Sequence, residues 1–249
     1  MNKNFWDNSF ELDKLAELSI KVGVALQPGQ DLLITAPLEA APLVRRLTLH
    51  AYQQGCGIVT PFYTDPEVTL IRYRTAGEES FDKSTDWLFD AMGAAFDKNT
   101  ARLAVVGEDP MLLSGQNVDY IGRANQAVSK ASSPVRERIT RFDVNWNIIA
   151  WPGTQWAKRV FPNLDEEKAQ KELASAIFQA SRLDGDDPIE NWNFHNKNLR
   201  ERTNWLNAKN FNALHFYGGG TDLKVGLAEG HEWMGGASKA RNGITCNPN

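Results

Sequence analysis

The chain has 249 residues, of which 42% are hydrophobic and 23% charged, a composition typical of a globular protein with a sizeable core. Its net charge of −4 at pH 7 excludes a general electrostatic role on nucleic acid or anionic membrane, because both require clustered Lys and Arg. No run approaches the ~18 apolar residues of a membrane span, and the first residues lack the apolar core of a signal peptide.

The two cysteines, Cys56 and Cys246, lie far apart in the sequence. They do not support a disulfide framework, and two cysteines alone cannot build a structural zinc site. We therefore expect reduced thiols and a cytoplasmic protein.

Helical and strand patterns alternate along the first half of the chain. Apolar spacing predicts helices over 11–26 and 39–54, and short apolar runs predict strands over 31–36 and 58–63. Pro61 indicates that the second strand lies at an edge of the sheet or late in it. This alternation predicts an α/β fold, a three-layer arrangement of a parallel-type sheet with helices on both faces.

The alternation continues less regularly towards residue 210. We predict a helix over 81–98, a strand over 101–106, a polar helix over 116–139, a strand over 144–151 and long helices over 165–182 and 188–208. The apolar side of the first of these helices carries Trp87, Leu88, Ala91, Ala95 and Phe96. Asp165 and Asp187 suit helix N-caps, and Pro188 suits the first helical position.

After Asn210 the pattern changes to strand, glycine turn and strand, followed by a glycine-rich stretch. We therefore expect an α/β N-terminal domain over 1–210 and, over 211–249, the first β-strands of an incomplete second domain, the start of a truncated catalytic domain. A sheet interrupted there exposes apolar side chains and unpaired backbone groups. Residues after about Asp222 are accordingly expected to pair with a second molecule or to be more disordered than the first domain.

No metal site is visible in the sequence. The four histidines, His50, His195, His215 and His231, form no closely spaced pair. A metal centre needs several His, Asp, Glu or Cys side chains that converge. A hydrogen-bonded structural role is expected for His50 and a packing role for His195, whereas His215 is expected to face away from its strand neighbours Leu214 and Phe216.

Nucleotide and nucleophile sites are also disfavoured. The chain lacks both the Gly-x-Gly-x-x-Gly and the Walker phosphate loops, and Gly218-Gly219-Gly220 precedes a strand, so a tight turn is expected there. No nucleophile elbow is present, and Cys56, between two glycines, is better explained by its small size than by catalysis. The eight tryptophans favour core or interdomain positions. We assign no catalytic, cofactor-binding or metal-binding residue to this chain.

Several spaced motifs carry a resemblance to a known family. They include Pro28-Gly29-Gln30, Ala41-Pro42-Leu43-Val44-Arg45, Trp151-Pro152, Val160-Phe161-Pro162, Thr221-Asp222-Leu223, Trp233-x-Gly235-Gly236 and the closing Asn247-Pro248-Asn249. Together they resemble the M29 metallo-aminopeptidases, the thermophilic aminopeptidase and PepS-like group. The likeness spans nearly the whole chain and is most specific in its tail.

The resemblance implies an exopeptidase that uses two divalent cations, zinc, cobalt or magnesium, with a shared water, and that acts on peptide substrates as a homo-oligomer. In that family a Thr-Glu-Glu segment with the first metal ligand follows the last Asn closely, and none of the family's ligand positions exists here. The chain is therefore expected to be the inactive N-terminal portion of such an enzyme and to bind no metal itself. No nucleic-acid or membrane partner is expected.

Two other interpretations of the sequence stay open. The first is a complete, non-catalytic α/β binding or interaction domain. The second, weaker one is a nucleotide-using enzyme, which the missing phosphate loop disfavours.

Overall fold

A four-stranded parallel sheet lies at the centre of the molecule. The computed structural model describes residue 6, residues 9–183, residue 185 and residues 187–248. The strands of the sheet are β1 (Leu32–Pro37), β2 (Val59–Thr64), β3 (Ala101–Val106) and β4 (Trp146–Ala150). They lie in the order β2-β1-β3-β4 with every neighbouring pair parallel, which confirms the predicted sheet and places Pro61 on an edge strand.

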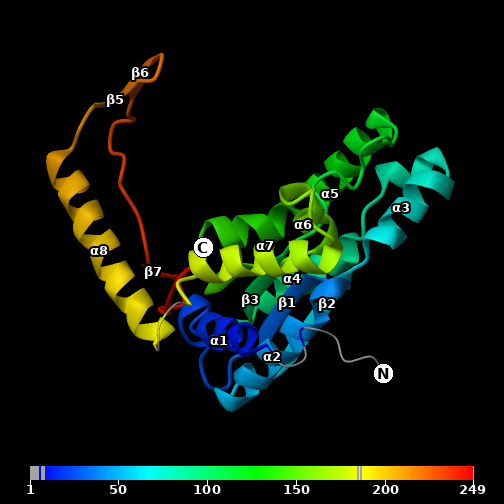
Figure 1. Ribbon diagram of the computed structural model, residues 1–249, viewed down its shortest axis with the longest axis horizontal. Helices are drawn as coiled ribbons and strands as arrows, with labels where there is room; N and C mark the ends of the chain where they lie inside the picture. Colours follow the sequence, from blue (N-terminus) through cyan, green and yellow to red (C-terminus); the bar gives the residue numbers. More distant parts are fainter. Residues whose placement is uncertain (1–5, 7–8, 184, 186, 249) are drawn as a thin grey trace.

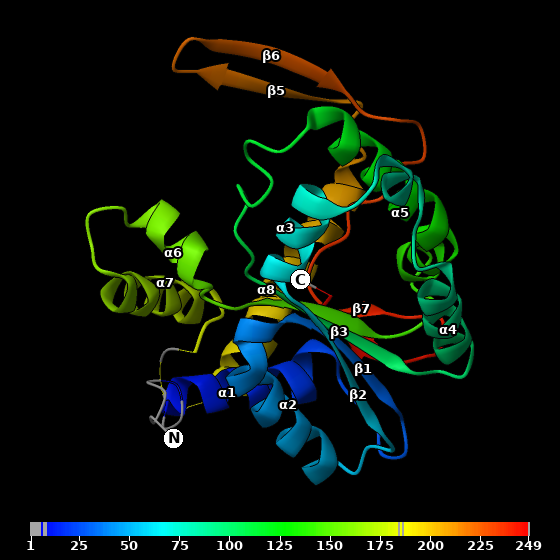
Figure 2. The same cartoon turned by 90° about the vertical axis from the view of Figure 1, so that its right-hand side faces the viewer.

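Helices cover both faces of this sheet (Figure 2). The main ones are α1 (Phe10–Leu18), α2 (Ala41–Gln53), α4 (Asp86–Asp97) and α5 (Val118–Thr140). Side chains alternate along β1: Ile34 packs in one cluster with Leu12 of α1 and Leu47 of α2, whereas Leu33 packs with Phe96 of α4. The expected three-layer architecture is therefore confirmed.

Shorter elements and the second half of the chain complete the structure. They are the π turn η2 (Ser19–Gly23), the 3-10 turns η3 (Leu38–Ala40) and η4 (Glu78–Asp82), the helices α3 (Pro66–Thr75), α6 (Thr154–Val160), α7 (Glu166–Ala180) and α8 (Pro188–Lys209), and the strands β5 (Ala213–Gly218), β6 (Thr221–Gly226), β7 (Ser238–Lys239) and β8 (Thr245–Cys246). Among the residues that the structure describes, no helix combines the length and apolar character needed to span a bilayer.

Two predicted helices have different limits in the structure. The helix predicted over 11–26 is α-helical only to Leu18, widens into η2, and ends before Ala25, whose φ is 50°. The helix predicted over 81–98 begins only at Asp86, because Phe81 is buried separately in η4. Its predicted apolar side is also wrong in part: Trp87 is 69% exposed, and the stripe that packs on the core runs through the buried Met92 and Phe96 and the partly buried Leu88 and Phe89.

Helices α3 and α6 were not predicted, for different reasons. Helix α3 starts with an Asp65 cap followed by Pro66, but it buries only Leu70, so it has no apolar stripe to reveal it. Helix α6 has Gly153 at its N-cap, which offers no side chain. The capping acceptor is the Glu39 carboxylate, whose Oε1 accepts hydrogen bonds from Thr154 N at 2.9 Å and from Gln170 Nε2 at 3.0 Å. Glu39 thus joins η3, α6 and α7.

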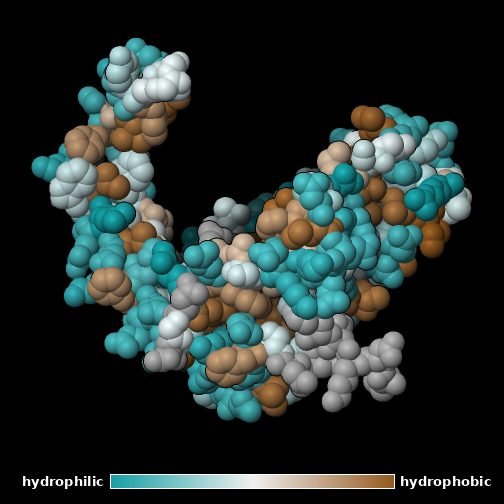
Figure 3. Space-filling model, in the orientation of Figure 1, coloured by the Kyte–Doolittle hydropathy of each residue, from teal (hydrophilic) through white to brown (hydrophobic). Residues whose placement is uncertain are grey.

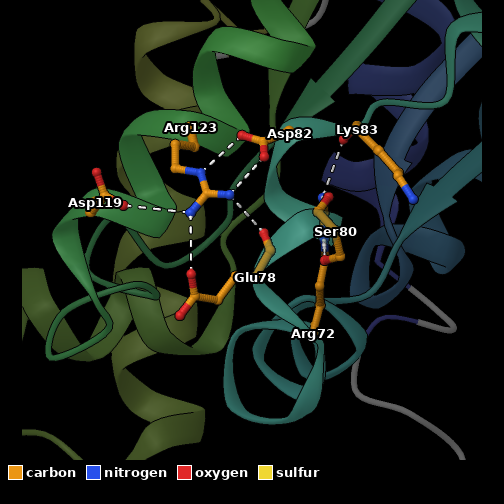
Figure 4. A network of polar contacts seen from close by, with 7 residues as sticks. All are labelled: Arg72, Glu78, Ser80, Asp82, Lys83, Asp119 and Arg123. Atoms are coloured by element: carbon orange, nitrogen blue, oxygen red, sulfur yellow. Dashed lines mark hydrogen bonds and ion pairs between the residues drawn. The ribbon is translucent and has the colours of Figure 1, made fainter.

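The η4 turn is held between α3 and α5 by two arginines (Figure 4). Arg123 of α5 donates to both carboxylate oxygens of Asp82, at 2.8 and 2.6 Å, and to the carbonyl of Glu78 at 3.0 Å. Arg72 of α3 donates to the carbonyls of Ser80 and Lys83. These contacts satisfy backbone acceptors that a short 3-10 turn leaves unpaired.

The apolar anchor of the same turn is Phe81, which is fully buried. Its ring stacks on Tyr120 with centroids 4.5 Å apart and an interplanar angle of 12°, and the Arg72 guanidinium lies 5.4 Å from the ring centroid. Aromatic stacking and the cation–π contact add to the burial of the ring. The turn is therefore fixed by one buried ring and two surrounding cations.

The link between Arg123 and Asp82 predicts an acid-sensitive contribution to stability. The hydrogen bonds and charge of Arg123 lower the pKa of Asp82, and a smaller desolvation effect acts in the opposite direction. A carboxylate with a lowered folded pKa stabilises the fold above its unfolded pKa of about 3.9, and this stabilisation is lost as the pH falls through the folded pKa. We expect Asp82→Asn to lower the urea midpoint at pH 7, and this deficit to shrink as the pH falls below the unfolded pKa.

The matched control is Asp90→Asn, the same substitution at an exposed position of α4. It should leave the urea midpoint unchanged across this range. A deficit of Asp82→Asn that stays constant from pH 7 to about pH 2 would show that the ion pair is not its cause.

Helix α8 carries a β-hairpin away from the body of the molecule. Asp187 caps the helix through hydrogen bonds from Ile189 N and Glu190 N, and Asn210, with φ 47°, ends it in the left-handed conformation. Both predicted caps, Asp187 here and Asp165 on α7, are confirmed.

The molecule forms an open U, with the hairpin on one arm and α3 and the end of α5 on the other (Figure 1). The space-filling view shows the hollow between the two arms (Figure 3).

The hairpin confirms the predicted strand, glycine turn and strand. Strands β5 and β6 are antiparallel, and Gly218, Gly219 and Gly220 all have positive φ, which glycine adopts more readily than other residues. Phe216 lies opposite Leu223, and these side chains are 50% and 52% exposed. One face of the hairpin therefore presents apolar side chains without a covering layer in the described part of the chain.

The last residues return to the α/β body. Ala240 is 3% exposed, Cys246 is fully buried and Asn247 is 6% exposed. The expectation that everything after about Asp222 would need a second molecule or be disordered is therefore wrong for residues 240–248. The reason is that polar side chains of the sheet bind this segment directly.

Candidate functional site

The most elaborate polar site of the molecule lies where residues 240–248 meet the sheet. Asn145, fully buried just before β4, donates from Nδ2 to the carbonyl of Val24 at 2.6 Å. Its Oδ1 accepts from Gln30 Nε2 at 2.7 Å and from Asn242 Nδ2 at 3.0 Å. One amide thus ties the end of η2, the turn before β1 and the C-terminal segment together, and we call this group the amide cluster.

The next asparagine of the strand holds the last described residues. Asn147 Nδ2 donates to the carbonyl of Asn247 at 2.7 Å, and Asn247 N donates to the carbonyl of Gly23 at 2.8 Å. Asn247 Nδ2 also reaches the carbonyl of Val22 at 3.2 Å. These acceptors are available because η2 is a π turn that ends at this point.

Gly23 leaves room for this contact. A Cβ at position 23 would lie 2.7 Å from Asn147 Oδ1, closer than real Cβ atoms approach. The absent side chain lets β4, η2 and the C-terminal segment meet side by side.

Two of the cavities at the junction lie beside β4. One, of about 300 Å³, lies between α1, η2 and β4, and its walls include Leu15, Leu18, Ile149 and Trp192. The other, of about 500 Å³, lies on the α5 side and is aromatic, with Phe142, Trp146, Trp192 and His195 among its walls. Asn247 lines both cavities.

The histidines singled out in the sequence do not converge. His50 Nε2 lies 3.1 Å from Asp13 Oδ1, which confirms its hydrogen-bonded structural role. His195 packs edge-on against Trp192, and its pKa is lowered by burial and by the nearby Arg182 and Arg202. His215 Nε2 lies 2.7 Å from Asp222 Oδ1, and His231 Nδ1 lies 2.8 Å from the carbonyl of Ala228.

The cysteines do not have the character of activated nucleophiles. Burial, helped by the negative charge of Asp31, raises the pKa of Cys56, and burial raises the pKa of Cys246. A nucleophilic thiol needs the opposite shift. Within the described ranges, no three His, Cys, Asp or Glu side chains come together as a metal site would require.

The carboxyl edge of the sheet, where doubly wound folds often bind ligands, is acidic and internally bonded. Glu39 is engaged by Thr154 and Gln170, and Glu108 Oε1 accepts from Thr64 Oγ1 at 2.6 Å. Carboxylates at this edge repel phosphate.

The tryptophans partly follow expectation, since Trp151 is fully buried with its ring 5.0 Å from that of Trp6, whereas Trp205 is 56% exposed.

The amide cluster was not predicted from the sequence. A signal for it was present, because Asn145 and Asn147 alternate inside an apolar strand and so point polar groups at buried positions. Buried amides nearly always find partners. Their partners, however, lie far away along the chain, and strand patterning does not reveal them.

The fold and the site define an α/β domain in which buried asparagine side chains bind the C-terminal segment of the same chain. Known proteins match it closely. A family model described as thermophilic metalloprotease (M29) matches residues 8–249. The chain therefore belongs to the M29 family of metalloproteases.

Individual relatives agree with this assignment. Aminopeptidase T of Thermus thermophilus is 48% identical over 238 residues, which cover 96% of this chain and 58% of that protein. Aminopeptidase 2 of Geobacillus stearothermophilus is 38% identical over 99% of this chain and 59% of that protein. The solved structure of wild-type AmpT from Thermus thermophilus superimposes with a TM-score of 0.91 at 47% identity, over 96% of this chain and 59% of that one. The chain thus spans less than two thirds of the length of these relatives.

The thiol of Cys246 reports whether the C-terminal segment is bound. Asn147→Ala removes the hydrogen bond to the carbonyl of Asn247 and leaves that buried acceptor unpaired, at a cost of about 1–2 kcal/mol. Because local opening exposes Cys246, we expect its reaction with a thiol-specific reagent in native conditions to accelerate about tenfold.

Two controls accompany this measurement. The reaction rate of Cys56 in the same molecule should not change, and Asn193→Ala, at an exposed position of α8, should leave both thiols unaffected. Equal acceleration of both cysteines would indicate global unfolding instead of release of the segment.

Proposed function

We propose that this chain is the N-terminal portion of a metal-dependent aminopeptidase, which removes N-terminal amino acids from peptides. The observation that carries the proposal is the 48% identity, over nearly the whole chain, to a protein named Aminopeptidase T. The matching structure of AmpT, at a TM-score of 0.91, supports the same fold for the corresponding part of both proteins.

The catalytic metals belong, in this proposal, to a part of the enzyme outside the 249 residues. The complete enzyme would hold two divalent cations, zinc, cobalt or magnesium. The residues present here do not fit such a centre, since the described part of the chain brings no three candidate ligands together. The chain alone is accordingly proposed to be inactive.

The proposed role of this chain is to limit access to the catalytic centre and to support assembly. Its two arms flank an open hollow, as Figures 1 and 3 show, and restricted access to a centre placed there would suit an enzyme that admits only the end of a peptide. The division into 1–210 and 211–249 stays a prediction, as does a cytoplasmic location.

A homo-oligomer is part of the same proposal. The exposed pair Phe216 and Leu223 on the hairpin supports it, because apolar faces of this kind are usually covered by another surface. We expect the sedimentation coefficient to rise with concentration, and the double variant Phe216→Ser/Leu223→Ser to abolish that rise. A chain that sediments as a monomer at every concentration would refute the self-association.

Aminopeptidase activity can be tested directly on the isolated chain. We expect no release of chromophore from leucine p-nitroanilide with Zn²⁺, Co²⁺ or Mg²⁺, because no convergent ligand set is available among the described residues. Aminopeptidase T of Thermus thermophilus, assayed alongside, is the positive control. Metal-stimulated hydrolysis by the pure chain, absent after chelation, would overturn the proposed inactivity.

A further inference from the structure

The outer edge of β4 carries backbone groups that face away from the sheet. In the parallel ladder with β3, Arg102 N donates to the carbonyl of Asn145 at 3.2 Å and Trp151 N donates to the carbonyl of Val106 at 2.7 Å. Since alternate residues of a strand face alternate sides of the ladder, the N–H and C=O groups of Trp146, Ile148 and Ala150 point outward. Strand β4 is last in the order β2-β1-β3-β4, so these groups lie at an edge.

Residues 246–248 already run along this edge. Ile148 N donates to the carbonyl of Pro248 at 3.0 Å, and the thiol of Cys246 donates to the carbonyl of Trp146 at 3.6 Å. The segment advances in the same direction as β4, which makes the pairing parallel. Pro248 has no N–H of its own, which explains why the thiol, and not a backbone donor, reaches the carbonyl of Trp146.

The next two outward groups are open. Within the described part of the chain, neither the carbonyl of Ile148 nor the N–H of Ala150 has a hydrogen-bond partner. The two cavities of the junction lie beside this stretch, and the walls of the smaller one include Ile148, Ile149 and Ala150. Open backbone groups with space beside them are what an added strand requires.

We propose that the edge of β4 is the docking site of a fifth parallel strand, formed by the residues that follow Pro248 in longer members of the family. Continuity with the pairing at Pro248 supports this occupant, and so does the length of the relatives, of which this chain covers 58% to 59%. The inference concerns the fold and goes beyond the proposed function.

The register of the strand follows from the bond at Pro248. In a parallel ladder, the residue two positions after Pro248 donates its N–H to the carbonyl of Ile148 and accepts from the N–H of Ala150. It then lies opposite Ile149, so its side chain is on the same face, the one that packs on α1 and η2. That face opens into the cavity of about 300 Å³ lined by Leu15, Leu18 and Trp192. The residue at this position is therefore apolar in the longer protein.

Hydrogen exchange followed residue by residue tests the proposal. The samples are this 249-residue chain and the full-length Aminopeptidase T of Thermus thermophilus, at equal pH and temperature. The amide of Ala150 should exchange at least about 100-fold more slowly in the longer protein, at the aligned position, than in this chain. The amide of Ile148, bonded to Pro248 in this chain, should be protected in both and serves as the internal reference. Equal rates at position 150 in the two proteins, whether both fast or both slow, would overturn the proposal.

A proline substitution gives a second, independent readout. Proline placed at Ala150 of this chain and at the aligned position of the longer protein removes the N–H in question from both. We expect the longer protein to lose more thermal stability than this chain, because only there is the N–H engaged. Equal losses would contradict the added strand. Neither measurement uses enzymatic activity, so either can fail while the proposed aminopeptidase function stands.

Discussion

The rest of the structure depends on the burial of a single amide. Asn145 is fully buried and bonds Val24 and Gln30, which lie between η2 and β1, and Asn242, which lies near the other end of the chain. A buried amide group that loses its hydrogen-bond partner costs about 1–3 kcal/mol. Moving any of these segments away would leave such a group unpaired, so this cost keeps the segments in place together with the hydrogen bonds themselves. The turn before β1, the end of η2 and the return of the C-terminal segment are fixed together. Because these segments are fixed, the apolar core around them packs in a single arrangement.

The fold was predictable where its causes are local. The four strands of the sheet, the Asp187-Pro188 start of α8 and the triple-glycine turn all follow from residues adjacent in sequence. Prediction failed where a distant group decided the outcome. The side of α4 that faces the core depends on where α5 lies, which explains the exposed Trp87. The helical cap of α6 comes from Glu39, 115 residues away.

The candidate site, like the fold, could be predicted from the sequence only in part. The resemblance in motifs identified the M29 family, which the family match over residues 8–249 confirms. The amide cluster was missed, because an asparagine in a strand does not reveal whether it meets solvent or another amide. Only the chain's return from β6 to the sheet brings Asn247 against Asn147 and Gly23. Long-range pairing of polar groups, unlike apolar periodicity, leaves little trace in a single sequence.

The junction between Asn247 and β4 also constrains how the protein is made. Asn147 Nδ2 bonds the carbonyl of Asn247, 100 residues further along the chain. A ribosome that adds 5–20 residues per second needs about 5–20 s to synthesise the chain between them. During that interval the sheet is complete except for one margin, with the Asn147 amide and the edge of β4 lacking their last neighbours. The nascent protein therefore passes through a long-lived stage in which its most exposed surface is a strand edge, the feature most prone to pair with other chains.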